Sequence, residues 1–374
     1  PKGLSEHHPL TSPDRATHPL LKQADGSFKA VSWDSAYDHM VATVQKVQAE
    51  HGPASFGVLS TGQLLTEEFY ALGKLVQLGF GTNNYDGNTT LCMSSAVVGY
   101  KQSFGSDGPP GSYKGLATAD VIFLIGANIA DNHPILWHHI RKNQNHKLIV
   151  CDPRKTKTAM LADLFLPLKP RRDIDLLNGL IHLVIKNDRV DKDYIEKHTT
   201  GYEALCKHAE PFDLATTVER TGIPEEKILE TYEAIAGGKN VFFGWTMGIN
   251  HSTQGSDTVS LINTLALITG NIGRTGAAPM SITGQCNAMG SREFSFSSSM
   301  PGYRKFESAV DRKELAELYQ IDENLFPTER GGNYPQIIDG ILEGKIKALW
   351  VIATNPLVSF PAVSYTHLRA HETN

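Results

Sequence analysis

Cys92 is the residue of this sequence whose type and setting are best suited to chemistry. It follows the polar loop 83–90 and lies at the start of segment 91–100, which is apolar and rich in small residues. A thiol at a helix start is stabilised as a thiolate by backbone N–H groups and the positive helix end, and a thiolate binds soft transition metals. A buried structural cysteine explains the same pattern, because free cysteine usually behaves as a small hydrophobic residue.

Two polar segments, 126–128 and 152–154, directly follow apolar runs that read as strands. Nucleotides bind at the ends of strands in an open parallel sheet, where loops and helix N-termini converge. Asp152 is placed like the carboxylate that binds a ribose in dinucleotide folds, although a turn aspartate before a proline explains it equally well. The sequence has no G-x-G-x-x-G, which weakens the case for a nicotinamide-dependent dehydrogenase.

Arg292 is the best candidate for binding an oxyanion. A planar guanidinium suits a planar, trigonal anion, because it donates two parallel N–H···O bonds. Glu293 follows it directly, so a surface salt bridge is the alternative explanation.

The elements that position these residues are apolar runs alternating with helical patterns. Such alternation predicts an α/β fold with doubly wound, mostly parallel sheets and helices on both faces. Segment 290–334 is rich in Ser, Gly and Arg, and we expect it to be irregular. The expected strands are 55–60, 120–126, 147–151, 164–168, 241–245 and 348–353, and the expected helices include 32–50, 66–78, 133–144, 172–186 and 253–268.

Length and composition limit the class of protein. A chain of 374 residues exceeds the size of one hydrophobic core, so we expect two domains. The net charge of -5 and the lack of a basic run argue against a nucleic-acid partner, and no apolar stretch is long enough to span a membrane. The 4 cysteines are far apart, which excludes an iron–sulfur or zinc-ribbon site built from this chain alone and fits a reducing compartment.

Segment 91–100, together with the turn 108–111, resembles the active-site segment of nitrate reductases, which are molybdopterin-guanine-dinucleotide oxidoreductases of the dimethyl sulfoxide reductase family. The resemblance runs from about Pro1 to Pro361. It implies that Cys92 is the protein's ligand to molybdenum in a Mo-bis(molybdopterin guanine dinucleotide) cofactor. It also implies that nitrate is reduced to nitrite by oxygen-atom transfer, with Arg292 at the nitrate, since an Arg-Glu occurs at this place in periplasmic nitrate reductases.

The resemblance also implies roles for other residues. Asp173 faces the guanine edge, although the family usually has Gly-Thr before it and this chain has Arg171 and Arg172. His251 stands where periplasmic nitrate reductases have Gln, and Lys2 bridges the pterin and an iron–sulfur cluster. The implied guanosine-diphosphate residues are Gly126, Ala127, Asn128, Asp152 and Arg154; those lining the pterins are Met247, Gly248, Gln285, Asn287 and Asn355; those near the metal are Gln63 and Asn88.

Both ends of the chain look cut when compared with this family. We expect 1–30 to be a linker after a missing [4Fe-4S] domain, 31–110 with 240–361 to be the molybdenum-site domain, 111–239 to be a dinucleotide-binding-like domain, and 362–374 to be a non-native tail. The family's C-terminal cofactor-binding domain is missing too, so this stretch alone should be inactive.

The electron donor would be ferredoxin, flavodoxin, an NADH-dependent reductase subunit or a cytochrome. The expected compartment is the cytoplasm, with the periplasm as the alternative.

Two other functions fit the same scaffold. In formate dehydrogenases the active-site Cys or selenocysteine is typically followed by His, and Met93 argues against that reading. A non-catalytic electron-transfer scaffold, like the related large subunit of respiratory complex I, lacks molybdenum, and Cys92 at the ligand position argues against it.

Overall fold

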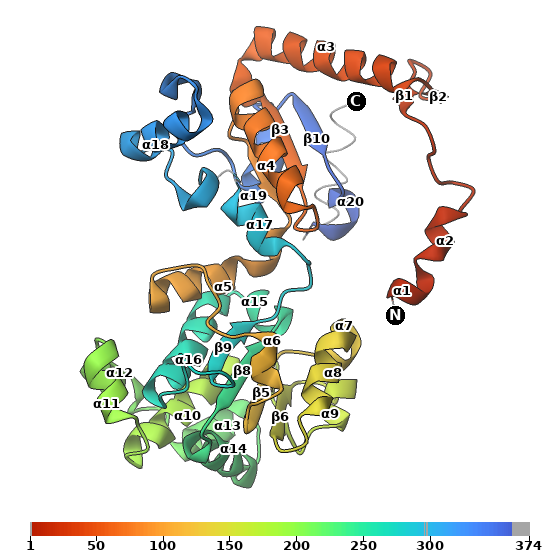
Figure 1. The fold of residues 1–374 in the computed structure, drawn as a ribbon. Helices are drawn as coiled ribbons and strands as arrows, with labels where there is room; N and C mark the ends of the chain where they lie inside the picture. The colour runs from red at the N-terminus through yellow and green to blue at the C-terminus, as the bar shows by residue number, and fades with distance from the viewer. Residues whose placement is uncertain (1, 295, 297, 361–374) are drawn as a thin grey trace. The chain divides into compact units, whose positions relative to one another are not determined.

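The computed structural model describes residues 2–294, 296 and 298–360 (Figure 1). The chain forms two compact units, Cys92–Gly284 and the discontinuous pair Pro1–Leu91 with Gln285–Asn374. The first is therefore inserted into the second. The predicted molybdenum-site domain, 31–110 with 240–361, included 92–110 and 240–284, but the structure groups both stretches with 111–239. The two strands within 240–284 join the same sheet as those of 111–239. The predicted tail, 362–374, lies outside the described residues.

The inserted unit is built on a parallel sheet which, in the described residues, has five strands in the order β7-β6-β5-β8-β9. Every pairing is parallel, and Phe123 of β5 faces Phe243 of β8. Strand β9 was not predicted, because it is short and contains Pro279, which is tolerated at a sheet edge. The strands are β5 Val121–Ile125, β6 Lys147–Asp152, β7 Leu164–Pro167, β8 Val241–Trp245 and β9 Ala278–Ser281.

Helices connect these strands, as a doubly wound sheet requires. Their bounds are α6 Tyr113–Leu116, α7 Ile129–Asn132, α8 Pro134–Lys142, α9 Lys157–Met160, α10 Asp173–Lys186, α11 Lys192–His198, α12 Tyr202–Ala209, α13 Leu214–Thr221, α14 Glu225–Gly237, α15 Met247–Asn250 and α16 Gly255–Ile268. Helix α5, Thr89–Phe104, contains Cys92 as its fourth residue.

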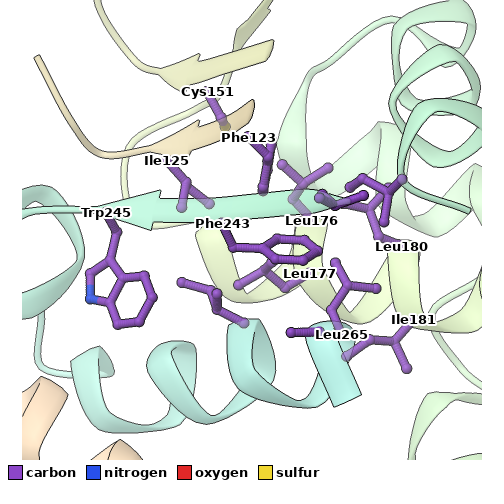
Figure 2. Packing of buried hydrophobic residues seen from close by; sticks show 14 of the residues in the cluster. Phe123, Ile125, Cys151, Leu176, Leu177, Leu180, Ile181, Phe243, Trp245 and Leu265 are labelled. Atoms are coloured by element: carbon purple, nitrogen blue, oxygen red, sulfur yellow. The ribbon is translucent and has the colours of Figure 1, made fainter. Parts of the chain in front are cut away.

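The main core of this unit lies between the sheet and helices α10 and α16 (Figure 2). Helix α10 is apolar along most of its length, and its residues Leu176, Leu177, Leu180 and Ile181 are fully buried. They pack in one cluster with Phe243 of β8 and other strand residues. Packing on this face holds the strands, and hence the loops at their carboxyl ends, in place.

The other unit contains, in the described residues, a three-stranded parallel sheet in the order β10-β3-β4. Ser32 caps the first long helix by accepting a hydrogen bond from the Ser35 amide, at the start of the predicted helix 32–50. Segment 290–334 is not irregular throughout, because Ser308 caps a helix there.

The bounds in this unit are α1 Lys2–Ser5, α2 His7–Leu10, β1 Leu20–Lys22, β2 Phe28–Ala30, α3 Trp33–His51, η1 Pro53–Ser55, β3 Phe56–Ser60, α4 Thr66–Lys74, the π-helix η2 Leu75–Gly79, β4 Tyr85–Gly87, α17 Ala288–Glu293, η3 Pro301–Tyr303, α18 Ala309–Tyr319, η4 Glu323–Leu325, α19 Tyr334–Leu342, β10 Ala348–Val351 and α20 Pro356–Ser359. None of the helices formed by the described residues has the length and apolar character needed to cross a membrane.

Leu180→Ala tests the packing of α10. Leu180 is fully buried, so its truncation should lower the free energy of unfolding by about 2–5 kcal/mol through lost transfer energy and a cavity. Urea unfolding followed by tryptophan fluorescence measures this. Leu161→Ala is the matched control, because Leu161 is 54% exposed, and equal losses in both variants would contradict the packing described.

Candidate functional site

Cys92 lies in the first turn of α5, where the sequence predicted a helix start. Its thiol forms no disulfide and is half-buried, and its Sγ contacts Sδ of Met247 at 3.2 Å. Met247 opens α15, directly after β8. The Ser95 hydroxyl donates to the carbonyl of Asn250 at 2.8 Å, which ties α5 to α15. The structure therefore brings the predicted residues Cys92 and Met247 together.

The loops after β5 and β8 meet through two glycines, both predicted as site residues. Gly126 has φ +59, and its carbonyl accepts hydrogen bonds from the Gly248 amide at 3.2 Å and the Thr246 hydroxyl at 2.8 Å. A Cβ atom on Gly248 would lie 2.6 Å from the Gly126 Cα. Only glycine fits this contact, and bare backbone of this kind lets a ligand approach a strand end closely.

Asn128 and Ala127 complete the predicted loop, but their side chains are not available to a ligand. Ala127 is fully buried. The Asn128 Oδ1 accepts from the Thr158 hydroxyl at 2.9 Å, and its Nδ2 donates to Asp131 at 2.8 Å. The Asn128 side chain therefore ties α7 to α9, and this loop can offer a ligand mainly its backbone.

Asp152 and Asp173 lie close enough to interact electrostatically. Asp173, the first residue of α10, has its pKa raised to about 6, chiefly by burial and further by the charge of Asp152. Asp152 ends β6, and its Oδ1 accepts a hydrogen bond from the Arg154 amide at 2.8 Å. This is the turn interaction that the sequence left open. The exposed Arg154 leaves this strand end at the surface.

In the other unit, Asn88 and Gln285 form a small polar network. The Gln285 Nε2 donates to Asn88 Oδ1 at 2.7 Å and to the Thr61 hydroxyl at 3.2 Å. Asn88 in turn donates to the Thr354 hydroxyl at 3.2 Å. The buried Gln285 Oε1 has no hydrogen-bond partner among the described residues, so this acceptor remains open to a donor from a ligand.

Asn287 and Asn355 act as helix caps. Asn287 accepts from the Gly290 amide at 3.3 Å at the start of α17 and donates to the Leu64 carbonyl at 2.9 Å. Asn355 accepts from the Leu357 amide at 3.1 Å at the start of α20. Gln63 is exposed in the loop after β3.

Arg292 lies in the last turn of α17, and its side chain is half-buried. Its guanidinium donates to the Ala288 carbonyl at 3.2 Å and to the Met289 Sδ at 2.9 Å. His251 follows α15 and is exposed, although partial burial of its ring lowers its pKa. The side chain of Lys2 lies outside the described part of the chain.

Asp86 is a buried charged group that the sequence analysis missed. It is 2% exposed, and it accepts hydrogen bonds from the Thr90 hydroxyl at 2.9 Å and the Tyr334 amide at 2.6 Å. These donors belong to the first turns of α5 and α19, and burial raises the pKa of Asp86 to about 6. In the sequence, only its place three residues before a helix start could have indicated this role. Strand β4, Tyr85–Gly87, is too short to be recognised from the sequence.

No three His, Cys, Asp or Glu side chains gather as a metal-binding group within residues 2–294, 296 and 298–360. A metal ion at Cys92 would therefore need most of its ligands from elsewhere. A cofactor that carries its own metal ligands meets this requirement, whereas a zinc site of three or four protein ligands does not.

Comparison with known proteins shows which family has this arrangement. A family model described as molybdopterin oxidoreductase matches residues 15–366. The chain belongs to the molybdopterin oxidoreductase family. The family and the α/β fold class expected from the sequence are thereby confirmed.

Similar proteins within the molybdopterin oxidoreductases include two nitrate reductases. The nitrate reductase of Synechocystis is 38% identical over 93% of this chain and 49% of its own length. The periplasmic nitrate reductase of Desulfovibrio desulfuricans is 33% identical over 96% of this chain and 50% of its own. The chain thus spans about half the length of these relatives.

The solved structure of acetylene hydratase from Pelobacter acetylenicus matches with a TM-score of 0.77 and 21% identity, covering 100% of this chain and 54% of that one. At this identity the likeness shows the fold.

The residues present fit a large molybdenum–pterin cofactor. Gly126 and Gly248 pack backbone against backbone, and Gly248 remains exposed beside the strand ends, which suits a phosphate-bearing arm. Asp152 and Asp173 offer acceptors to N–H and O–H donors, and the open acceptor of Gln285 suits a polar heterocycle. Cys92 would supply a soft ligand to the metal.

Asp86→Asn tests whether the buried Asp86 carboxyl titrates as its surroundings indicate. The folded state binds the Asp86 proton more tightly than the unfolded chain, since the pKa rises from 3.8 to about 6. The resulting stabilisation is fully present below pH 3.8 and is lost as the pH rises through about 6, at a cost on the order of 3 kcal/mol at most.

Asparagine cannot ionise. The thermal midpoint of Asp86→Asn minus that of wild type should therefore become more positive as the pH is raised from about 5 to about 7.5. Differential scanning fluorimetry across this range gives the comparison. Asp38→Asn, on the exposed side of α3, is the control for loss of a carboxylate at the surface. If the difference in thermal midpoint between Asp86→Asn and wild type stays constant or falls as the pH rises, Asp86 does not have a raised pKa in the folded state.

Proposed function

We propose that this chain is the central, catalytic part of a nitrate reductase of the assimilatory or periplasmic-like type. The observation that carries the proposal is the half-buried thiol of Cys92 in the first turn of α5, with its Sγ against Sδ of Met247. Two nitrate reductases align with this chain over more than nine-tenths of it, and Cys92 lies inside the aligned stretch. The proposed reaction is the reduction of nitrate to nitrite by transfer of one oxygen atom.

The cofactor is, in this proposal, molybdenum held by two molybdopterin guanine dinucleotides. When bound, it supplies the two-electron redox chemistry. Cys92 provides the protein's thiolate, and the backbone N–H groups of the first turn of α5 favour the charged sulfur. The contact with Met247 gives that sulfur an apolar, polarisable neighbour.

The rest of the site binds the cofactor's arms. The backbone at Gly126 and Gly248 receives a diphosphate, while Asp152 and Asp173 accept hydrogen bonds from the ribose and guanine of a nucleotide. Asn88 and Gln285, already joined at 2.7 Å, offer polar atoms to a pterin. Lys2, Gln63, Ala127, Asn128, Arg154, His251, Asn287 and Asn355 stay proposed contacts, with Asn128, Asn287 and Asn355 limited mainly to backbone because their side chains cap or tie helices.

Nitrate is bound, in this proposal, by Arg292. A guanidinium donates two parallel N–H···O bonds to two oxygens of a planar anion and leaves the third oxygen free to react. The half-buried Arg292 side chain is already held by a hydrogen bond to the Ala288 carbonyl at the start of its own helix, α17, so little side-chain entropy remains to be lost when the anion binds.

The electrons come, in this proposal, from a [4Fe-4S] cluster outside this chain, with Lys2 between the cluster and the pterin. The donor to that cluster would be ferredoxin, flavodoxin, an NADH-dependent reductase subunit or a cytochrome. Cytoplasm is the proposed compartment, with the periplasm as the alternative.

Cys92→Ala in the full-length protein should abolish nitrate reduction while the fold survives. Alanine removes the thiolate but leaves only a small cavity at a helix start. Nitrite formation with reduced methyl viologen, together with molybdenum analysis and the thermal midpoint, measures this. Cys206→Ala is the matched control, since Cys206 is also half-buried but lies in α12. Full nitrate reduction by Cys92→Ala would refute the metal-ligand role.

Arg292→Lys should raise the Michaelis constant for nitrate more than it lowers turnover. Lysine keeps the charge but loses the planar pair of donors, at a cost of about 1–3 kcal/mol in binding. Arg330→Lys, a surface ion-pair arginine, is the control in the same steady-state assay. If nitrate kinetics are unchanged in Arg292→Lys, nitrate is bound by another residue.

A further inference from the structure

Asn250, the last residue of α15, lies at the centre of a buried hydrogen-bond network that the sequence analysis did not predict. Its Oδ1 accepts a hydrogen bond from the indole N–H of Trp245 at 3.1 Å, and its Nδ2 donates to the Ser281 hydroxyl at 3.2 Å. Trp245 ends β8 (Figure 2), and Ser281, its partner in the sheet, ends β9. One side chain thus joins α15 to the carboxyl ends of two neighbouring strands.

The same network reaches α5 directly beside Cys92. The Asn250 Nδ2 also contacts Sδ of Met93 at 3.5 Å, and the Ser281 hydroxyl contacts this sulfur at 3.7 Å. The backbone carbonyl of Asn250 accepts a hydrogen bond from the Ser95 hydroxyl at 2.8 Å. Asn250 therefore contacts the residue that follows Cys92 and a second residue of the same helical turn.

Ser281 is itself held by α5, because its amide donates to the Tyr100 hydroxyl at 2.6 Å. Tyr100 lies about two turns after Cys92 in α5. The side chains of the network share deep burial, each residue being no more than 5% exposed: Met93, Tyr100, Trp245, Asn250 and Ser281. A buried network whose polar groups are paired fixes one arrangement of its elements, since breaking a bond leaves a buried polar group without a partner.

We propose that Asn250 is a positioning residue for Cys92. By joining α5, α15 and the ends of β8 and β9, it holds the Cys92 Sγ against Met247 and keeps the thiolate in one place for the metal. Met247 lies three residues before Asn250 in α15, so the side chain that fixes α15 also fixes the neighbour of the thiol. The proposal rests on the proposed function, in which Cys92 is the metal ligand.

Asn250→Leu in the full-length protein, prepared without cofactor, tests the position of the thiol. Leucine has a similar size but forms none of the side-chain hydrogen bonds, so α5 and α15 should separate more often and expose Cys92. The rate of Cys92 alkylation by iodoacetamide is divided by that of Cys206, a half-buried thiol in the same molecule. Peptide mass spectrometry should show this alkylation ratio rising about two- to tenfold, as expected for the loss of one ordinary hydrogen bond.

Asn263→Leu is the matched control. Asn263 is also buried, and its Nδ2 ties α16 to α5 through the Gly99 carbonyl at 3.3 Å and the Ser103 hydroxyl at 3.1 Å. Both leucine variants should lower the thermal midpoint, whereas only Asn250→Leu should raise the alkylation ratio. An equal rise in both variants, or no rise in Asn250→Leu, overturns the positioning role and leaves Asn250 a contributor to stability alone.

Ser281→Ala is the milder variant, and it decides the question where Asn250→Leu does not fold. It removes one acceptor of the Asn250 amide and leaves the bond to Trp245 in place. The alkylation ratio should rise in the same direction as in Asn250→Leu, but by less. An unchanged ratio in folded Ser281→Ala would overturn the inference.

The cofactor-loaded enzyme separates failure of this inference from failure of the proposed function. Asn250→Leu should lower kcat per bound molybdenum about ten- to hundredfold, as removal of a residue that supports a metal ligand typically does. KM for nitrate should change little, since Arg292 binds nitrate in the proposed function. Full nitrate reduction by Cys92→Ala overturns the proposed function and the inference with it. An inactive Cys92→Ala beside wild-type kcat in Asn250→Leu overturns the positioning role alone.

Discussion

The backbone contact between Gly126 and Gly248 is the constraint on which the inserted unit's site depends. Parallel pairing of β5 with β8 brings their carboxyl ends together, and the missing side chains let the two following loops touch at hydrogen-bond distance. This contact fixes the start of α15, so that Met247 reaches Cys92. One pair of strand ends thus sets both the thiol's surroundings and the bare backbone that suits a phosphate.

The buried Asp86 and the half-buried Asp173 have similarly raised pKa values but different proposed roles. Asp86 is enclosed by donors from α5 and α19, so its hydrogen bonds serve the fold. Burial and the negative charge of Asp152 raise the pKa of Asp173, and only a hydrogen bond from its own backbone amide lowers it. A half-buried acid with few partners beside a strand end is the pattern of a ligand site, whereas a buried acid that accepts hydrogen bonds from two helix starts is the pattern of a structural residue.

The long apolar runs made the sheet predictable from the sequence, because β5, β6 and β8 are buried on both faces and leave no alternation to misread. Strands β4 and β9 were missed, since three or four residues with a glycine or a proline carry no periodic signal. The position of Cys92 in a first helical turn was also predictable, from the polar loop before it. It was not predictable that Asn287 and Asn355 use their side chains as helix caps or that Asn128 ties α7 to α9, because an asparagine beside a helix start suits a cap and a ligand contact equally.

The central claim is that Cys92 is a molybdenum ligand. Molybdenum K-edge X-ray absorption on the full-length, cofactor-loaded protein tests it most directly. The account predicts that Cys92→Ser replaces one sulfur neighbour of the metal by a lighter oxygen neighbour while molybdenum content is retained. A sulfur shell identical in wild type and Cys92→Ser, at equal molybdenum content, would contradict it.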